Sequence, residues 1–265
     1  MQDQILLHAI FAISAQHMRL ISETDETEGS CYYSHCISLL IPIISQAEQN
    51  CDENVLAGTV ILRLYEEMSG TCQASELVLS DTKLMVSVDD NRCHLLGSIR
   101  LLNLITSFSS SGGLGEAASW VILRQVIYIS LVSKEPMSIR LENYKQSHSF
   151  LKQDDYSWTN IMVLLFAKVL LVAFMPQDDI SIEDWVELEA AIEEWNVSKP
   201  ETFNLLSLRE GAPSKETPFP EIWMLNASHG NFCSLGMIFT CKSNHFKSSY
   251  RRPALLSGQV IHPGI

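Results

Sequence analysis

The sequence is poor in the residues that interrupt helices. Only 12 of its 265 residues are glycine and 9 are proline. Because folds with many short strands need frequent turns, and turns depend on these two residues, the scarcity argues against a β architecture and favours long helices. Apolar residues make up 46% and charged residues 18% of the chain, so a packed core can form without disulfides or metals.

Positive charge is also scarce. The chain holds 18 lysine and arginine residues against 31 acids, a net charge of −13. Residues 241–265 contain four of the basic residues and no acid, which leaves 14 basic against 31 acidic residues in 1–240. A surface with that charge repels phosphate, and the chain has no basic stripe, so we expect no direct binding to nucleic acid.

Features of membrane and secreted proteins are missing as well. Residues 1–19 lack the basic start of a signal peptide. The longest apolar run, 161–174, is too short to cross a bilayer and contains Lys168. We therefore expect no membrane partner. The cysteines form no CxxC pair and are odd in number, which is typical of reduced intracellular thiols; they are Cys31, Cys36, Cys51, Cys72, Cys93, Cys233 and Cys241.

Apolar residues recur at spacings of three and four through most of the chain, the pattern of an amphipathic helix. The expected helices cover residues 1–19, 30–49 with a kink at Pro42, 54–69, 94–108, 114–132, 156–174 capped by Asp154 or Asp155, 182–196 and 219–239. Residues 71–91 and 211–220 have the composition of loops. The predicted core face of the first helix consists of Ile5, Leu6, Ala9, Ile10, Ile13 and His17.

These helices predict an all-α fold, a single compact multi-helix bundle, because several of them are apolar all round and must be buried. The helical period fails after Cys241. We therefore expect a helical domain over residues 1–240 and an irregular, poorly ordered basic tail over 241–265.

Motifs of catalysis and metal binding are absent. The histidines are scattered without an HExxH spacing, and the chain has no GxSxG elbow, phosphate-binding loop or dinucleotide fingerprint. Cys31, His35 and Cys36 lie close together, but zinc sites usually take ligands in pairs from two places, and the second pair is missing. We expect no catalytic residue, no cofactor and no metal.

A buried polar network is the one candidate site. Arg63 precedes Glu66 and Glu67 by three and four residues, the spacing of ion pairs along a helix. Arg124 falls inside an otherwise apolar helix, where a charge needs a partner. We expect Arg124 to pair with Glu66 or Glu67; the alternative is that it contacts an anionic effector.

Several segments, taken in order, resemble one family. Seven stretches carry the resemblance, followed by Ala227 and Gly230: LLHAIFAISA (6–15), CYY (31–33), AGTVILRLYEE (57–67), HLLGS (94–98), GLGEAASWVILRQVIY (113–128), DDYSWTN (154–160) and PFPEIW (218–223). Together they are similar to the fungal-specific transcription factor domain that follows Zn2Cys6 DNA-binding clusters, in its ARCA-like branch.

The resemblance implies a helical regulatory domain of an RNA polymerase II transcription factor. It implies a nuclear location, dimerisation with itself or with related regulators, and contacts with the transcription machinery. The chain departs from the family in two ways. It contains no six-cysteine cluster, so its usual basic N-terminal region is absent and the cytosol is the alternative location. Its last 25 residues turn polar and basic where the family continues a leucine-rich helix.

Three other functions stay open. The domain could sense a small molecule, with Arg124 or His94 as polar anchors in a pocket between helices. It could be an inert, truncated fragment of a zinc-cluster regulator. An unrecognised helical enzyme is the third, and it requires histidines and carboxylates that converge in a cleft.

Overall fold

A computed structural model describes residues 2–22, 27–44, 51–69, 93–174, 182–209 and 221–225. The chain divides into two compact units, each described here by itself. The first comprises residues Met1–Gln153 and Ala167–Ile180, and the second comprises Asp154–Phe166 and Ser181–Ile265. Nearly all described elements are helices, which confirms the predicted all-α class.

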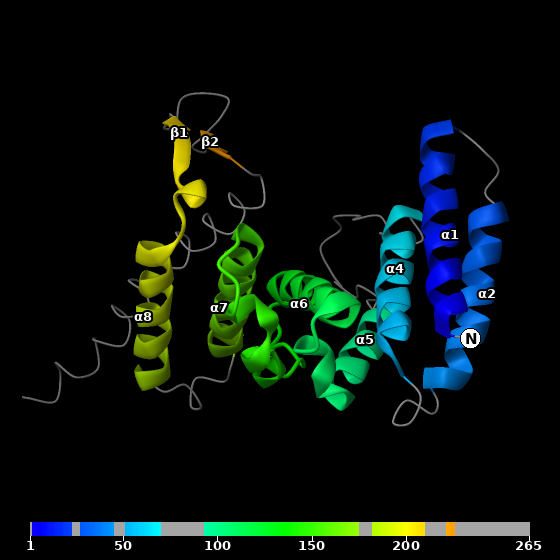
Figure 1. Ribbon diagram of the computed structural model, residues 1–265, viewed down its shortest axis with the longest axis horizontal. Coiled ribbons are helices and arrows are strands. Elements are labelled where there is room, and N and C mark those ends of the chain that lie inside the picture. The colour runs from blue at the N-terminus through cyan, green and yellow to red at the C-terminus, as the bar shows by residue number, and fades with distance from the viewer. Residues whose placement is uncertain are drawn as a thin grey trace, which may run out of the picture. The chain divides into compact units, whose positions relative to one another are not determined.

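Three helices form one end of the first unit: α1 (Gln2–Ser22), α2 (Thr27–Ile44) and α4 (Glu53–Ser69). They run side by side, with α1 in contact with both others (Figure 1). Small residues allow the close approach. A side chain at Gly58 would meet Ile5, and one at Gly29 would meet the backbone of α1. The thiol of Cys36 donates to the carbonyl oxygen of Ile5 at 3.3 Å, joining α2 to α1.

The rest of the first unit is built on α5 (Cys93–Leu104) and α6 (Gly113–Ser133). The short 3-10 helices η1 (Thr106–Ser109), η2 (Leu141–Gln146) and η3 (His148–Phe150) accompany them. Two glycines with positive φ, Gly112 at 73° and Gly113 at 63°, turn the chain into α6. Side chains other than glycine rarely adopt that conformation, so these residues set where α6 begins.

Helix α7 (Asp155–Phe174) crosses the division between the units, and α8 (Ile182–Ser198) belongs to the second. Asp154 caps α7, because its carboxylate accepts from the backbone N–H of Ser157 at 2.8 Å. A short 3-10 turn, η5 (Glu201–Phe203), leads into a two-stranded antiparallel hairpin of β1 (Leu205–Arg209) and β2 (Glu221–Met224). Trp195 holds this part together: its ring nitrogen donates to the Trp158 carbonyl at 3.0 Å, and its ring packs edge-on against Phe203.

Most predicted helices are present, and their ends differ by a few residues. Helix α5 ends at Leu104 and is followed by η1, rather than continuing to residue 108. The helix predicted over 219–239 is wrong at 221–224, which form a strand paired with β1; its other residues lie outside the described part. The loops predicted at 71–91 and 211–220, the domain boundary at 240 and the tail 241–265 also lie outside it.

The predicted core face of α1 is partly wrong. Ile5 and Ala9 are buried as expected, and Ala12 and Gln16 complete the buried side. Ile10 and His17 are exposed instead. Because α1 is apolar on both sides, its periodicity alone does not tell which side packs inward.

Candidate functional site

The predicted carboxylate pair lies on α4 beside one arginine. The guanidinium of the largely buried Arg63 is 3.3 Å from Glu67 and 3.9 Å from Glu66. Tyr33 of α2 donates its hydroxyl to Glu66 at 2.7 Å, and its ring stacks on Tyr65 with centroids 5.0 Å apart. Burial and this hydrogen bond to a carboxylate raise the pKa of Tyr33. The group therefore ties α2 to α4, and the sequence did not indicate the tyrosine.

Arg124 contacts the backbone of its own helix and lies near a buried phenol. Its Nη1 donates to the carbonyl oxygen of Trp120 at 2.9 Å, one turn earlier in α6. It also acts electrostatically on Tyr144, a fully buried phenol whose ring lies 4.8 Å from that of Trp120. Burial raises the pKa of Tyr144, and the nearby guanidinium works against that rise. The predicted pairing of Arg124 with Glu66 or Glu67 and the alternative of an anionic effector both stay predictions. His94, the other proposed anchor, has a side chain outside the described part.

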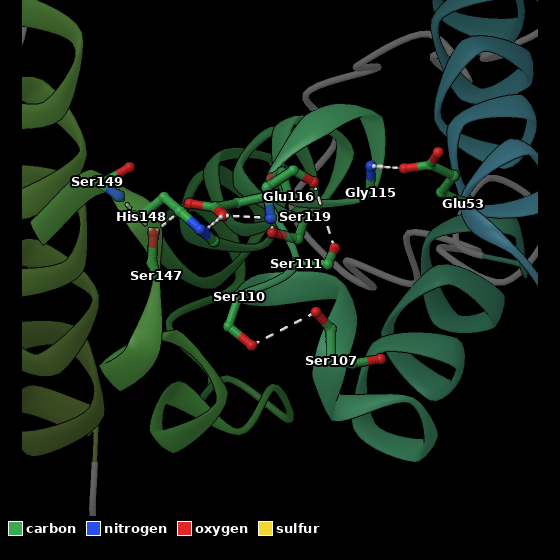
Figure 2. Close-up of polar contacts among 11 residues, drawn as sticks. Glu53, Ser107, Ser110, Ser111, Gly115, Glu116, Ser119, Ser147, His148 and Ser149 are labelled. Atoms are coloured by element: carbon green, nitrogen blue, oxygen red, sulfur yellow. Dashed lines mark hydrogen bonds and ion pairs between the residues drawn. The ribbon is translucent and has the colours of Figure 1, made fainter. Parts of the chain in front are cut away.

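Two carboxylates cap the beginning of α6 (Figure 2). Glu116 accepts from the backbone N–H of Gly112 at 2.9 Å, and Glu53, from α4, accepts from that of Gly115 at 3.0 Å. The first N–H groups of a helix have no partner within it and carry partial positive charge, so both acids stabilise α6 there. This cap was not predicted from the sequence. The available signal was an acid in the first turn after a glycine pair.

Glu116 also fastens the segment that follows η2. Its Oε1 accepts from the hydroxyl of Ser147, and its Oε2 lies 3.1 Å from Nδ1 of His148 (Figure 2). Burial acts to raise the pKa of Glu116, but the bonds from Ser147, His148 and Gly112 outweigh it and hold the pKa below its usual value.

This cluster contains a serine, a histidine and a carboxylate, but not in the order that activates a nucleophile. In a catalytic triad the histidine lies between the serine and the acid. Here Glu116 takes both contacts, and Ser147 accepts from the N–H of Ser149 at 3.1 Å. The arrangement is that of a structural clamp.

A cluster of aromatic and imidazole rings joins α1 and α2. His8 lies 4.4 Å from His35, measured between ring centroids, and 6.1 Å from Tyr32, which in turn packs on Phe11 at 5.2 Å. Nδ1 of His8 is buried and has no hydrogen-bond partner. Burial and the neighbouring His35 lower the pKa of His8. The cluster therefore favours the neutral form of His8.

The feature that packing leaves unexplained is the outer side of α1. Opposite its buried side, five apolar side chains remain between 41% and 65% exposed. Because successive residues of a helix are turned by about 100°, these side chains fall within a stripe roughly 100° wide around the helix axis. They are Leu7, Ile10, Phe11, Met18 and Ile21. We call this set, with Ser14 at its centre, the α1 outer face. A surface helix normally carries polar residues there, so the α1 outer face is a candidate interaction surface.

Charge and metal ligands are sparse around this surface. Helix α1 carries one acid and one base, Asp3 and Arg19, and α2 carries only Glu28. Within the described ranges no three histidine, cysteine, aspartate or glutamate side chains could hold one metal ion. Cys31 is exposed and Cys36 is buried, and burial raises the pKa of the Cys36 thiol to about 11.

By length and composition, three helices of the described part could cross a membrane: Asp3–Ser22, Gly113–Ser133 and Asp155–Phe174. In Gly113–Ser133 and Asp155–Phe174, more than half of the most apolar 18-residue stretch is buried inside the protein. In Asp3–Ser22 only 22% of that stretch is buried. Packing thus accounts for much of the apolar character of α6 and α7. It does not account for that of α1.

Comparison of the chain with protein-family models, curated proteins and solved structures gave no match.

Proposed function

We propose that this chain is the helical regulatory domain of a fungal RNA polymerase II transcription factor, and that it acts through protein contacts. The observation that carries the proposal is the α1 outer face, five exposed apolar side chains around Ser14 on a helix whose other side is already packed. Exposed apolar patches of this kind mark sites that interact with proteins, membranes or ligands, and we propose a protein partner. The order of the family-like segments supplies the transcriptional context.

Charge supports an indirect role at DNA. The net charge of −13 opposes contact with the phosphate backbone. The charge of the described helices is uneven: α8 holds six acids and no base, whereas α1 and α2 together hold two acids and one base. A partner protein therefore meets little electrostatic repulsion at α1 and α2. The polar clusters at Arg63 and Glu116 hold helices together and supply no acid–base pair facing an open cleft, so we propose no enzymatic activity.

A tethered reporter assay tests the proposal. The full chain is fused to an unrelated DNA-binding domain and expressed in fungal cells with a matching reporter gene. We expect a change of several-fold in reporter transcription relative to the DNA-binding domain alone. The L7E variant, which places a charge on the α1 outer face, should abolish the change. The control L151E alters a leucine that is 78% exposed elsewhere in the same unit, and it should leave the change intact.

Equal reporter output from the fusion and the DNA-binding domain alone, at matched protein levels, would refute the proposal. A gel-shift experiment complements it. At low salt, where electrostatic binding is strongest, the isolated chain should not retard duplex DNA. Retardation that disappears as salt is raised would contradict the indirect role.

A further inference from the structure

Two histidines from neighbouring helices meet where α1 packs on α2. The rings of His8 on α1 and His35 on α2 have centroids 4.4 Å apart and planes inclined at 71°. We infer that these two imidazoles together bind a divalent transition-metal ion of the kind that prefers imidazole nitrogen, such as Zn²⁺ or Cu²⁺. Such a site would add to the proposed protein contact and does not depend on it.

The separation of the two rings suits two ligands of one ion. Bonds from zinc to imidazole nitrogen are about 2.0–2.1 Å long, and the ring centre lies ~1.1 Å beyond the nitrogen, so each centroid is roughly 3.2 Å from the metal. Two such ligands at about 90–110° around the ion have their centroids roughly 4.5–5.2 Å apart. The observed 4.4 Å lies at the lower edge of this range. A small movement of one ring is therefore enough to admit the ion.

Ring packing leaves one atom of His8 without a partner. Its Nδ1 is buried and forms no hydrogen bond, although the rings of Phe11 and Tyr32 lie beside it. A buried polar atom without a partner costs stability, and such atoms are rare in folded proteins. His35 is exposed, so its ring can turn and present either nitrogen. A metal ion between the two rings gives Nδ1 of His8 the partner that it lacks.

Protonation and charge around His8 favour a bound cation. Metal ions bind imidazole in its neutral form, so protons compete with them. Burial and the neighbouring His35 lower the pKa of His8, which weakens that competition at neutral pH. Helix α2 contains no lysine or arginine, and the one base of α1, Arg19, lies about three turns beyond His8. No base on either helix is therefore close enough to repel the ion strongly.

Two protein ligands make an exchangeable site, with water in the remaining positions, whereas structural zinc sites have four protein ligands. In the described ranges no three candidate side chains share one ion, so Cys31, one turn before His35 on α2, stays outside the site. The bound ion fastens α1 to α2 and therefore stabilises the first unit. From the sequence, His35 was considered only with Cys31 and Cys36, because a ligand from another helix becomes evident only in the tertiary structure.

Titration of the full chain with Zn²⁺, followed by NMR of the histidine rings, tests the site residue by residue. The chain is labelled with ¹⁵N and kept reduced at pH 7.5, and the variants H8N and H35N assign the two ring signals. We expect the signals of His8 and His35 to shift together as Zn²⁺ is added. Mg²⁺, which prefers oxygen ligands, should shift neither. Zn²⁺ that shifts neither signal, or only one of them, would overturn the inference.

Variants measure what each ligand contributes. H35N removes an exposed ligand, so it should fold like the unchanged chain by circular dichroism. It should weaken Zn²⁺ binding to the remaining ring of His8 by at least ~10-fold, because losing even a residue that supports a ligand costs 10–100-fold in metal affinity.

H17N is the matched control, because it removes an exposed histidine elsewhere on α1, and it should bind like the unchanged chain. Zn²⁺ should raise the urea midpoint of the unchanged chain and of H17N, but raise that of H35N less. Equal Zn²⁺ binding at His8 in H35N and the unchanged chain would overturn the inference. Loss of the His8 and His35 shifts in a C31S variant would overturn the two-histidine ligand set.

Discussion

Gly58 offers a sharp test of how α1 packs on α4. A methyl group at Gly58 would lie 2.7 Å from Cγ2 of Ile5, closer than side chains in proteins approach. Ile5 is fully buried, and because its side chain branches at Cβ, Cγ2 moves only if χ1 leaves its preferred rotamer or the helix shifts. The substitution G58A therefore forces Ile5 out of its preferred rotamer or pushes α1 away from α4.

Two opposing effects set the magnitude. Overpacking of this kind costs about 1–3 kcal/mol, and replacing glycine by alanine inside a helix returns about 1 kcal/mol. We expect G58A to lower the free energy of unfolding by about 1 kcal/mol, measured by urea unfolding followed by circular dichroism. Gly97 of α5 is the matched control, because a methyl group there has no atom within 4 Å. G97A should therefore raise the stability by about 0.5–1 kcal/mol.

A double-mutant cycle isolates the contact. In an I5A background the colliding methyl group is gone, so G58A should become stabilising, as G97A is. If G58A stabilises the unchanged chain to the same extent as G97A, the close approach of α1 and α4 is refuted. A loss from G58A that persists in the I5A background would place the collision somewhere other than Ile5.

Three further predictions concern titratable groups. The E116Q variant should lower the free energy of unfolding at pH 7 by about 1.5–3 kcal/mol, the typical value for hydrogen bonds to a charged group. Because the pKa of Glu116 is held below its usual 4.5, the loss of stability relative to the unchanged chain should be smaller at pH 4. An equal loss at both pH values would contradict the clamp. Burial and His35 lower the pKa of His8, so the unchanged chain should lose stability as the pH falls through about 6.5, and H8F should lose less in urea unfolding at pH 8 and 5.5. Burial raises the pKa of Cys36 to about 11, so peptide mapping after brief iodoacetamide treatment at pH 8 should find Cys31 modified well before Cys36, and equal rates would show that Cys36 is accessible.

Features that depend on neighbours within one helical turn were predictable. Asp154 was expected as a cap, and it accepts from the N–H of Ser157. Arg63 was expected beside Glu66 and Glu67, and both contacts are present. In each case the partners are three or four residues apart, so the helix itself brings them together.

Contacts between distant parts of the chain were not predictable in the same way. Tyr33 reaches Glu66 across 33 positions, and Glu116 meets Ser147 across 31. The strand at 221–224 was mistaken for a helix because its apolar residues form a short run that fits either period. Only pairing with β1 decides between them.

The sequence by itself determined that this protein is all-α. Scarce glycine and proline, together with apolar residues three and four apart, act through local backbone preference and need no knowledge of the fold. The tertiary structure alone decided which side of α1 is covered. Both sides of α1 are apolar. Gly58 of α4 and Gly29 of α2 let these helices pack closely against the side of α1 that holds Ile5 and Ala12. The α1 outer face is what remains after that selection, so the interaction surface is a consequence of packing between helices that no single helix encodes.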